Sequence, residues 1–268
     1  MQIFYTFATD KKTTVMLFHK HIFGPIISRR LGVSLGINLL PNEGKICSFD
    51  CIYCECGFNK DGRADTRLAS REELRADLAA FLNEYAAGNN RPIDTITFAG
   101  NGEPTLHPEF EGIVDDTLAL RNQYAPDAQV SVLTNAWHLD KPEVVWALRK
   151  VDNCMLKLDS AISETVAKLN RPVNPHFDLD RHIDQLASFG KSCIVQTLFV
   201  RGAGVDNTTD EEVSAWIKAL VRIAPRQVQL YPIDRKTPME GLEKVPVEEL
   251  RQIAAKVEKL GIETQVIG

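Results

Sequence analysis

Short apolar runs alternate with amphipathic segments along most of this chain. The runs have the length of β-strands that are buried in a sheet, and turn residues bound most of them. We predict strands at residues 35–40, 94–99, 129–133, 153–158, 192–200 and 227–231, and an edge strand at 262–267.

The segments between these runs carry apolar residues at helical spacing. Pairs in which an acidic residue follows a capping residue by three positions predict three helix starts. These pairs are Ser70 with Glu73, Asp140 with Glu143, and Thr209 with Glu212. Further helices are predicted at 110–120, from 163, at 179–189 and at 247–260, the last one ending at Gly261.

Strands that are regularly separated by helices pair in parallel through right-handed crossovers. Six such units are too few for a closed eight-fold barrel. The pattern therefore predicts an α/β fold, a partial (β/α)6 TIM-like barrel. No linker rich in Gly, Ser or Pro divides the chain, so we predict one barrel domain at residues 33–268 after an N-terminal extension at 1–32.

The formal net charge is −5, so the chain lacks the basic surface of a protein that binds nucleic acid by charge alone. A local basic group near the start is compatible with a phosphate or carboxylate site, or with a solvated face. It consists of Lys11, Lys12, Lys20, Arg29 and Arg30. The first ten residues do not resemble a signal peptide, and no apolar stretch is long enough to cross a bilayer. We expect a cytoplasmic protein, with Met1 or Met16 as the native start.

Three cysteines form a C-x-x-x-C-x-x-C run at Cys47, Cys51 and Cys54. Thiolates at this spacing suit a soft metal centre, and iron–sulfur clusters usually take four of them. A loop with three would leave one iron open for a substrate or cofactor. Zinc is the alternative, with Cys56 or His107 as fourth ligand, but the second C-x-x-C pair typical of structural zinc is missing.

Polar residues follow the predicted strands at their carboxyl ends, where parallel α/β folds place their sites. These residues are the turn Gly100, Asn101, Gly102, Glu103, then Thr134, Asn135, Asp159, Ser160, and at the ends of the strands predicted at 192–200 and 227–231 Arg201, Tyr231, Asp234 and Arg235.

Each of these features also has a purely structural interpretation. The glycine turn is compatible with a tight loop, and Asp159 with a helix cap or a ribose contact. Lys157 precedes Asp159 by two residues and should share its face of the strand. Gln196 lies inside an apolar strand, where a cofactor or a core hydrogen bond would satisfy it.

The cysteine run, with Tyr53 before its last cysteine, and the Gly100–Glu103 turn together resemble the radical S-adenosylmethionine (SAM) superfamily. The resemblance implies an oxidoreductase with a [4Fe–4S] cluster on Cys47, Cys51 and Cys54. It further implies that S-adenosylmethionine chelates the open iron, is cleaved by one electron and yields a 5′-deoxyadenosyl radical that abstracts hydrogen from a substrate. The cofactor residues that it implies are Tyr53, Gly100, Asn101, Gly102, Glu103, Thr134, Asn135, Asp159, Ser160 and Gln196.

Residues 23–36 are similar to the iron–sulfur oxidoreductases that neighbour the wyosine-synthesis tRNA enzyme. The acidic charge and the lack of a cysteine after Cys193 favour a small-molecule or protein substrate over RNA. The resemblance also implies an external electron donor such as flavodoxin or ferredoxin. The alternatives are a glycyl-radical enzyme activase, a tRNA-modifying enzyme, and a non-enzymatic electron carrier or redox sensor. The candidates for holding an anionic group of the substrate are Arg29, Arg30, Arg201 and Arg235.

Overall fold

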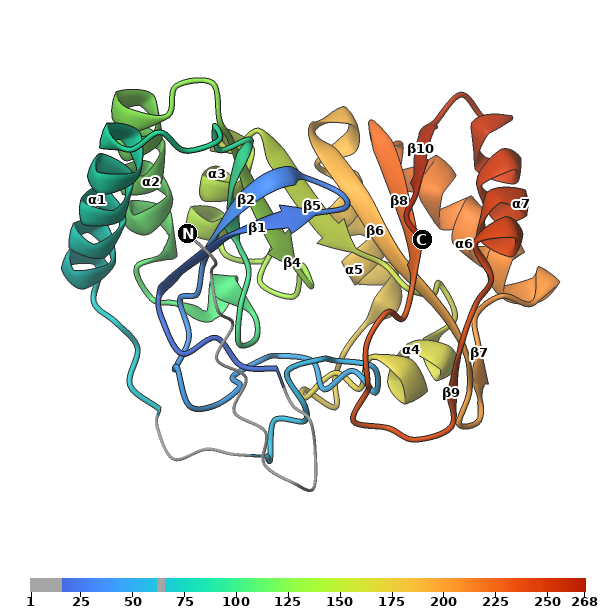
Figure 1. Ribbon diagram of the computed structural model, residues 1–268. Coiled ribbons are helices and arrows are strands. Elements are labelled where there is room, and N and C mark those ends of the chain that lie inside the picture. The colour runs from blue at the N-terminus through green and yellow to red at the C-terminus, as the bar shows by residue number, and fades with distance from the viewer. Residues whose placement is uncertain (1–15, 62–65) are drawn as a thin grey trace. The chain divides into compact units, whose positions relative to one another are not determined.

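The computed structural model describes residues 16–61 and 66–268 (Figure 1). Lys11, Lys12 and the first fifteen residues of the predicted extension lie outside the described residues. The chain divides into two compact units. Unit 1 comprises the described residues of Met1–Cys47, Asn59–Leu133 and Lys141–Cys154, and unit 2 comprises Ser48–Phe58, Thr134–Asp140 and Met155–Gly268.

Unit 1 contains a mixed sheet in which β2, β3 and β4 run parallel. β1 (Ile22–Ser28) pairs antiparallel with β2 (Gly32–Ile37), and β2 pairs in register with β3 (Thr95–Phe98). β3 in turn pairs with β4 (Gln129–Thr134). All four residues of β3 are buried. Threonines alternate with Ile96 and Phe98, and the buried hydroxyls of Thr95 and Thr97 are bonded at 2.8 Å to the hydroxyls of Ser131 and Ser34 on the neighbouring strands.

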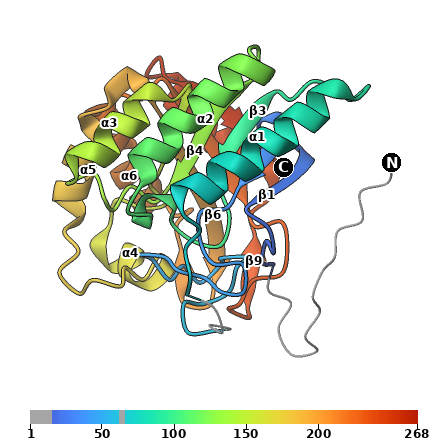
Figure 2. The same ribbon diagram turned by 90° about the vertical axis from the view of Figure 1, so that its left-hand side faces the viewer.

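Three helices of unit 1 lie side by side (Figure 2). They are α1 (Arg71–Ala87), α2 (Phe110–Tyr124) and α3 (Pro142–Lys150), with the 3₁₀ helix η1 (Pro104–Leu106) before α2. The predicted capping box of α1 is confirmed, because Ser70 and Glu73 bond each other's backbone. The predicted cap at Asp140 is wrong: the N-cap is Lys141, with no side-chain bond, and Pro142 alone starts the helix.

β5 (Asn153–Lys157) begins in unit 1 and ends in unit 2. The strand order from there is β5, β6 (Cys193–Gly202), β8 (Gln227–Pro232) and β10 (Glu263–Val266). β8 runs parallel to both β6 and β10. Two short strands, β7 (Val205–Asp206) and β9 (Leu242–Lys244), pair antiparallel with the carboxyl end of β6.

The helices of unit 2 bury one apolar side each and leave the other exposed. They are α4 (Ser163–Leu169), α5 (Leu179–Ala187), α6 (Asp210–Ile223) and α7 (Val247–Glu258), with the 3₁₀ helix η2 (Gly190–Ser192) after α5. On α6, Trp216 is 1% exposed, and its indole N–H bonds the Leu158 carbonyl oxygen at 3.2 Å. This bond fixes the chain just before Asp159.

The predicted strands and helices are all present, with ends that differ by a few residues. The pattern did not predict β1, β7 or β9. β1 lies inside the region predicted as an extension, and the domain boundary at residue 33 stays a prediction. Among the described residues, no helix has both the length and the apolar character needed to cross a membrane.

Candidate functional site

In unit 2 the cysteine loop, residues 48–58, is fastened by the segment 169–173 that follows α4. The Asp50 N–H donates to the Asn170 carbonyl oxygen at 3.0 Å, and the Ile52 N–H donates to the Leu169 carbonyl oxygen at 3.0 Å. The Val173 N–H donates back to the Ser48 carbonyl oxygen at 2.9 Å. These bonds hold the loop as a paired ribbon, so the main chain around Cys51 has a defined position.

Two further contacts fasten the same loop. The Met239 N–H donates to the Ile52 carbonyl oxygen at 3.2 Å. The amide of Asn135 donates to the Ser48 hydroxyl at 2.9 Å. The loop after β4 therefore meets the cysteine loop, as expected if the carboxyl ends of the strands form the site.

In unit 1 the Gly100–Glu103 turn holds the main chain just before Cys47. The Ile46 N–H donates to the Asn101 carbonyl oxygen at 3.1 Å, and the Glu103 N–H donates to the Ile46 carbonyl oxygen at 3.1 Å. A Cβ on Gly102 would lie 1.8 Å from that Ile46 oxygen, and Gly102 has a φ of +135°. Only glycine permits this close approach of two backbones.

Cys47 itself is clamped by the side chain of Asn59. The Cys47 N–H donates to Asn59 Oδ1 at 3.1 Å, and Asn59 Nδ2 donates to the Cys47 carbonyl oxygen at 3.1 Å. Both polar groups of the Cys47 main chain are thereby satisfied, and its side chain is half-buried.

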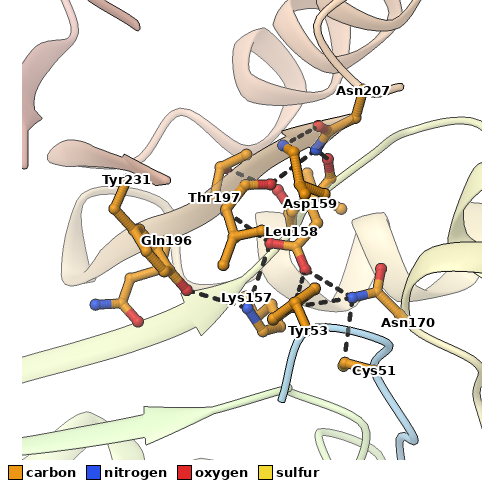
Figure 3. Close-up of polar contacts among 12 residues, drawn as sticks. Cys51, Tyr53, Lys157, Leu158, Asp159, Asn170, Gln196, Thr197, Asn207 and Tyr231 are labelled. Carbon is orange, nitrogen blue, oxygen red and sulfur yellow. Dashed lines mark hydrogen bonds and ion pairs between the residues drawn. The ribbon is translucent and has the colours of Figure 1, made fainter. Parts of the chain in front are cut away.

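Asp159 is the centre of a buried polar network in unit 2 (Figure 3). Its Oδ2 accepts from Asn170 Nδ2 at 2.6 Å and from the Tyr53 hydroxyl. Its Oδ1 accepts from the Leu198 N–H at 2.8 Å and from Lys157 Nζ at 3.3 Å. The side chain is 0% exposed, so protein donors satisfy the carboxylate without water.

Lys157 supplies the positive charge of this network, which confirms that it shares a face with Asp159. Its Nζ donates to the Tyr231 hydroxyl at 3.1 Å and lies 5.0 Å from the centre of the Tyr53 ring. Burial is the largest single influence and would lower the pKa of Lys157, but the Asp159 carboxylate, Tyr231 and Cys51 together outweigh it and raise the pKa. Lys157 is therefore a permanent cation and is unsuited to act as a neutral amine nucleophile.

The thiol of Cys51 is buried beside this network. Burial raises the pKa of Cys51, while the Lys157 charge and a 3.5 Å bond from Asn170 Nδ2 to Cys51 Sγ oppose that rise. Both opposing contacts favour a thiolate, which is the form that binds metal. Burial likewise raises the pKa of Tyr53, whose hydroxyl stays a proton donor to Asp159.

The other predicted cofactor residues are engaged as follows. Glu103 Oε1 accepts from the Thr105 hydroxyl at 2.6 Å, and Thr134 Oγ1 accepts from the Ala136 N–H at 3.0 Å. The Ser160 hydroxyl donates to Glu212 at 2.6 Å. Gln196 Nε2 donates to Gln229 Oε1 at 2.7 Å, the core hydrogen bond that was one of its two expected partners. Asn101 bonds the main chain of Phe18 and Pro41 through its side chain.

Two of the four arginines predicted to hold an anion pair with carboxylates: Arg201 with Glu249, and Arg235 with Glu55. Within residues 16–61 and 66–268, no three His, Cys, Asp or Glu side chains are grouped closely enough to hold a metal ion. The cysteine triad therefore stays a prediction. Asn170 was not predicted, because an asparagine before Arg-Pro indicates no more than the end of a helix.

Similar proteins were found among curated sequences. The protein named GTPase Obg from Brachyspira hyodysenteriae is 30% identical over 91% of this chain and 34% of its own length. A UPF0026 protein of Helicobacter pylori is 27% identical over 80% of this chain and 66% of its own length. The chain thus spans only part of these relatives.

Solved structures with the same fold were also found. A radical SAM methyltransferase from Sphaerobacter thermophilus matches with a TM-score of 0.65 and 16% identity, over 87% of this chain and 65% of its own. TYW1, a wyosine-synthesis protein bound to a lysine-pyruvate adduct, matches with a TM-score of 0.57 and 13% identity, over 84% and 73%. At such identities the likeness concerns the fold, an α/β fold with an unclosed parallel sheet, and it confirms the predicted fold class.

The model of the family described as the Radical SAM superfamily matches residues 43–220, more than half of the chain. The matched region begins just before the cysteine loop and ends within α6. The chain therefore belongs to the Radical SAM superfamily, whose members are enzymes that use a [4Fe–4S] cluster and S-adenosylmethionine.

Proposed function

We propose that this chain binds a [4Fe–4S] cluster through Cys47, Cys51 and Cys54, and with it cleaves S-adenosylmethionine to act on a substrate. When bound, the reduced cluster would supply the electron that splits the cofactor into methionine and a 5′-deoxyadenosyl radical, which then abstracts hydrogen. The protein's own residues bind, orient and shield the reactants.

The surroundings of Cys51 are the observation that carries this proposal. Its buried sulfur has an amide donor at 3.5 Å from Asn170 and a fixed positive charge from Lys157 nearby. Donors and cations around a thiolate are what an anionic cluster requires from its protein. A cysteine that served only as core packing would need neither.

The amino and carboxylate groups of S-adenosylmethionine would reach the open iron beside the Gly100–Glu103 turn. We propose that buried Glu103 accepts a hydrogen bond from the ammonium group, and that the turn's backbone lies close to the methionine part. Gly100 has no room for a Cβ, which would lie 2.4 Å from Asn38 Oδ1. The turn is therefore built for a close backbone approach.

We propose that the adenosine part contacts residues at the end of β4, after β5 and within β6. These are Thr134, Asn135, Asp159, Ser160 and Gln196, together with Tyr53 of the cysteine loop. Asp159 differs from the rest because its oxygens already accept four protein donors. A ribose contact there would need one of these bonds to exchange, so we propose that Asp159 acts mainly by holding Tyr53 and Asn170.

Enzymes of this family take their electron from an external donor, and we propose a flavodoxin or ferredoxin for this chain. The substrate is proposed to be a small molecule or a protein, since the net charge of −5 does not favour RNA. Membership of an enzyme family supports catalysis over the electron-carrier interpretation.

The test is anaerobic reconstitution with iron and sulfide, followed by S-adenosylmethionine and dithionite, with release of 5′-deoxyadenosine measured by chromatography. The triple variant C47A/C51A/C54A should bind no cluster and should release no 5′-deoxyadenosine. Cys56→Ala is the matched control, because Cys56 lies in the same loop outside the motif, and it should retain both properties. A cluster-loaded wild type that binds no S-adenosylmethionine would contradict the proposal.

A further inference from the structure

Asn170 touches the cysteine loop through its backbone and its side chain at once. Its carbonyl oxygen accepts from the Asp50 N–H at 3.0 Å, and its Nδ2 lies 3.5 Å from Cys51 Sγ. The residue is 2% exposed.

The chain around Asn170 is shaped to make this double contact. Asn170 is the C-cap of α4, and the next residue, Arg171, has a φ of +47°. A left-handed conformation at a long side chain is uncommon and costs free energy, about 1 kcal/mol or more. The strain turns the chain so that Pro172 and Val173 run back along Phe49 and Ser48.

The orientation of the Asn170 amide is set by Asp159. Nδ2 has two hydrogens and three acceptors in reach: Asp159 Oδ2 at 2.6 Å, the Tyr53 hydroxyl oxygen at 3.2 Å and Cys51 Sγ at 3.5 Å. The short bond to the carboxylate takes one hydrogen. The Tyr53 hydroxyl donates its own proton to the same carboxylate, which leaves the second amide hydrogen for the hydroxyl oxygen and the sulfur. Figure 3 marks the contacts of Nδ2 as dashed lines.

Asp159 is itself held by further hydrogen bonds. The Leu198 N–H of β6 and the Lys157 ammonium of β5 hold its other oxygen, and Asn207 Nδ2 donates to its carbonyl oxygen at 2.8 Å. The chain of contacts thus runs from the sheet, through one carboxylate and one amide, to a single sulfur.

We propose that Asn170 is the positioning residue of the cysteine loop: it orients the Cys51 sulfur and, through its N–H···S contact, raises the reduction potential of the cluster bound there. This inference rests on the proposed function. A donor at a cluster sulfur stabilises the reduced state, which carries one more negative charge. Removing the donor therefore lowers the potential and makes the cluster harder to reduce.

The experiment compares wild type with N170L and N170A, which both remove the donor. Leucine keeps the branched shape of asparagine at a larger volume, and alanine leaves a smaller side chain. Asn174→Ala is the matched control, since Asn174 is an exposed amide just after the segment 169–173, and its Oδ1 accepts from the His176 N–H at 2.9 Å. The readout is the midpoint potential of the reconstituted cluster, followed by electron paramagnetic resonance during redox titration. We expect both Asn170 variants to shift to lower potential and N174A to match the wild type.

Fully loaded Asn170 variants with the wild-type potential would overturn the inference. The proposed function is judged separately, by cluster content and 5′-deoxyadenosine release of the wild type. If the wild type takes up no cluster, that function fails and the potential part of the inference falls with it.

Where the Asn170 variants take up no cluster, hydrogen exchange in the cluster-free proteins decides the question. The Asp50 and Ile52 amides should exchange several-fold faster in N170L than in the wild type and in N174A, because the ribbon at residues 169–173 has loosened. Unchanged exchange at these two amides would overturn the positioning role.

Discussion

The ion pair of Lys157 and Asp159 is a largely buried pair of charges in unit 2. The Asp159 side chain is 0% exposed and that of Lys157 is 19% exposed. Removing one partner of such a pair leaves a charge in a poorly solvated place, which destabilises far more than losing a surface ion pair.

We predict that Lys157→Met lowers the free energy of unfolding by about 3 kcal/mol. The double variant K157M/D159N should recover part of that loss, because it leaves no buried charge. Denaturant titration of the cluster-free proteins measures both. Lys168→Met is the matched control: its pair with Glu164 is exposed, and its loss should cost less than about 0.5 kcal/mol. Equal losses for Lys157 and Lys168 would contradict the predicted burial cost.

Buried His182 on α5 makes the stability of the fold depend on pH. Burial lowers the pKa of His182 to about 4, while the unfolded chain has a value near 6.5. The unfolded state therefore binds a proton first as the pH falls, and stability is lost between about pH 6.5 and pH 4. The His182 ring packs against the rings of Phe49 and Phe177, and a phenylalanine at position 182 would keep these contacts.

We predict that the free energy of unfolding of His182→Phe falls less between pH 6.5 and pH 4 than that of the wild type, by up to roughly 3 kcal/mol. The measurement is urea denaturation at half-unit pH steps. His176→Ala changes an exposed histidine of the preceding loop and should leave the wild-type pH profile intact. A parallel profile for H182F and wild type would show that another group causes the acid sensitivity.

At the scale of elements, the Gly100–Glu103 turn shows why two glycines stand after β3. Gly102 faces a backbone oxygen of residue 46 with no space for a Cβ, whereas Gly204, also left-handed with a φ of +79°, has nothing within 4 Å. Both positions have a positive φ, but only Gly102 is crowded. Alanine substitutions at the two positions therefore separate the cost of backbone strain from the cost of a steric clash.

We predict that Gly102→Ala destabilises the protein by several kcal/mol and lowers cluster content, because the main chain before Cys47 must move. Gly204→Ala should cost only about 1 kcal/mol of left-handed strain and leave cluster content unchanged. Thermal unfolding and iron analysis measure the two effects. If both variants lose the same stability and iron, crowding at Gly102 is not the reason for glycine there.

The periodicity of the sequence predicted the parallel strands and their helices because each element buries a face of its own. β1 escaped prediction because its seven residues are mostly half-buried and include Gly24 and Pro25, which interrupt a strand pattern. β7 and β9 are two and three residues long, too short for any periodic signal. The cap at Lys141 was missed because local spacing does not reveal which residue leaves the helix.

For the site, sequence spacing grouped residues that share a loop but could not show their partners. The Cys51 environment combines Lys157 of β5 with Asn170, and the latter carries no motif of its own. Ser160 follows a predicted strand and Gln196 lies inside one, and each is bonded to a protein partner, Glu212 or Gln229. Such partners come from helices and strands far along the chain, which pattern analysis cannot pair.

At the scale of the whole molecule, membership of the family indicates the type of chemistry but does not identify the substrate. The charge of the chain bears on the class of substrate. The chain has 31 Lys and Arg against 36 Asp and Glu, and its pI is about 5.7. Binding of a nucleic acid depends on phosphate neutralisation by clustered cations and weakens steeply with salt. An acidic chain offers this only where basic residues gather, as at Arg29 and Arg30.

We therefore predict no saturable binding of tRNA to the cluster-loaded protein at micromolar concentrations, even at about 50 mM salt, where phosphate contacts are strongest. Filter binding with labelled tRNA measures this, and a basic RNA-binding protein provides the positive control. Saturable binding that weakens at least tenfold between about 50 and 200 mM salt would contradict the prediction. The variant R29A/R30A then identifies its source: loss of binding would assign the RNA contact to this basic pair and make a tRNA substrate the leading hypothesis.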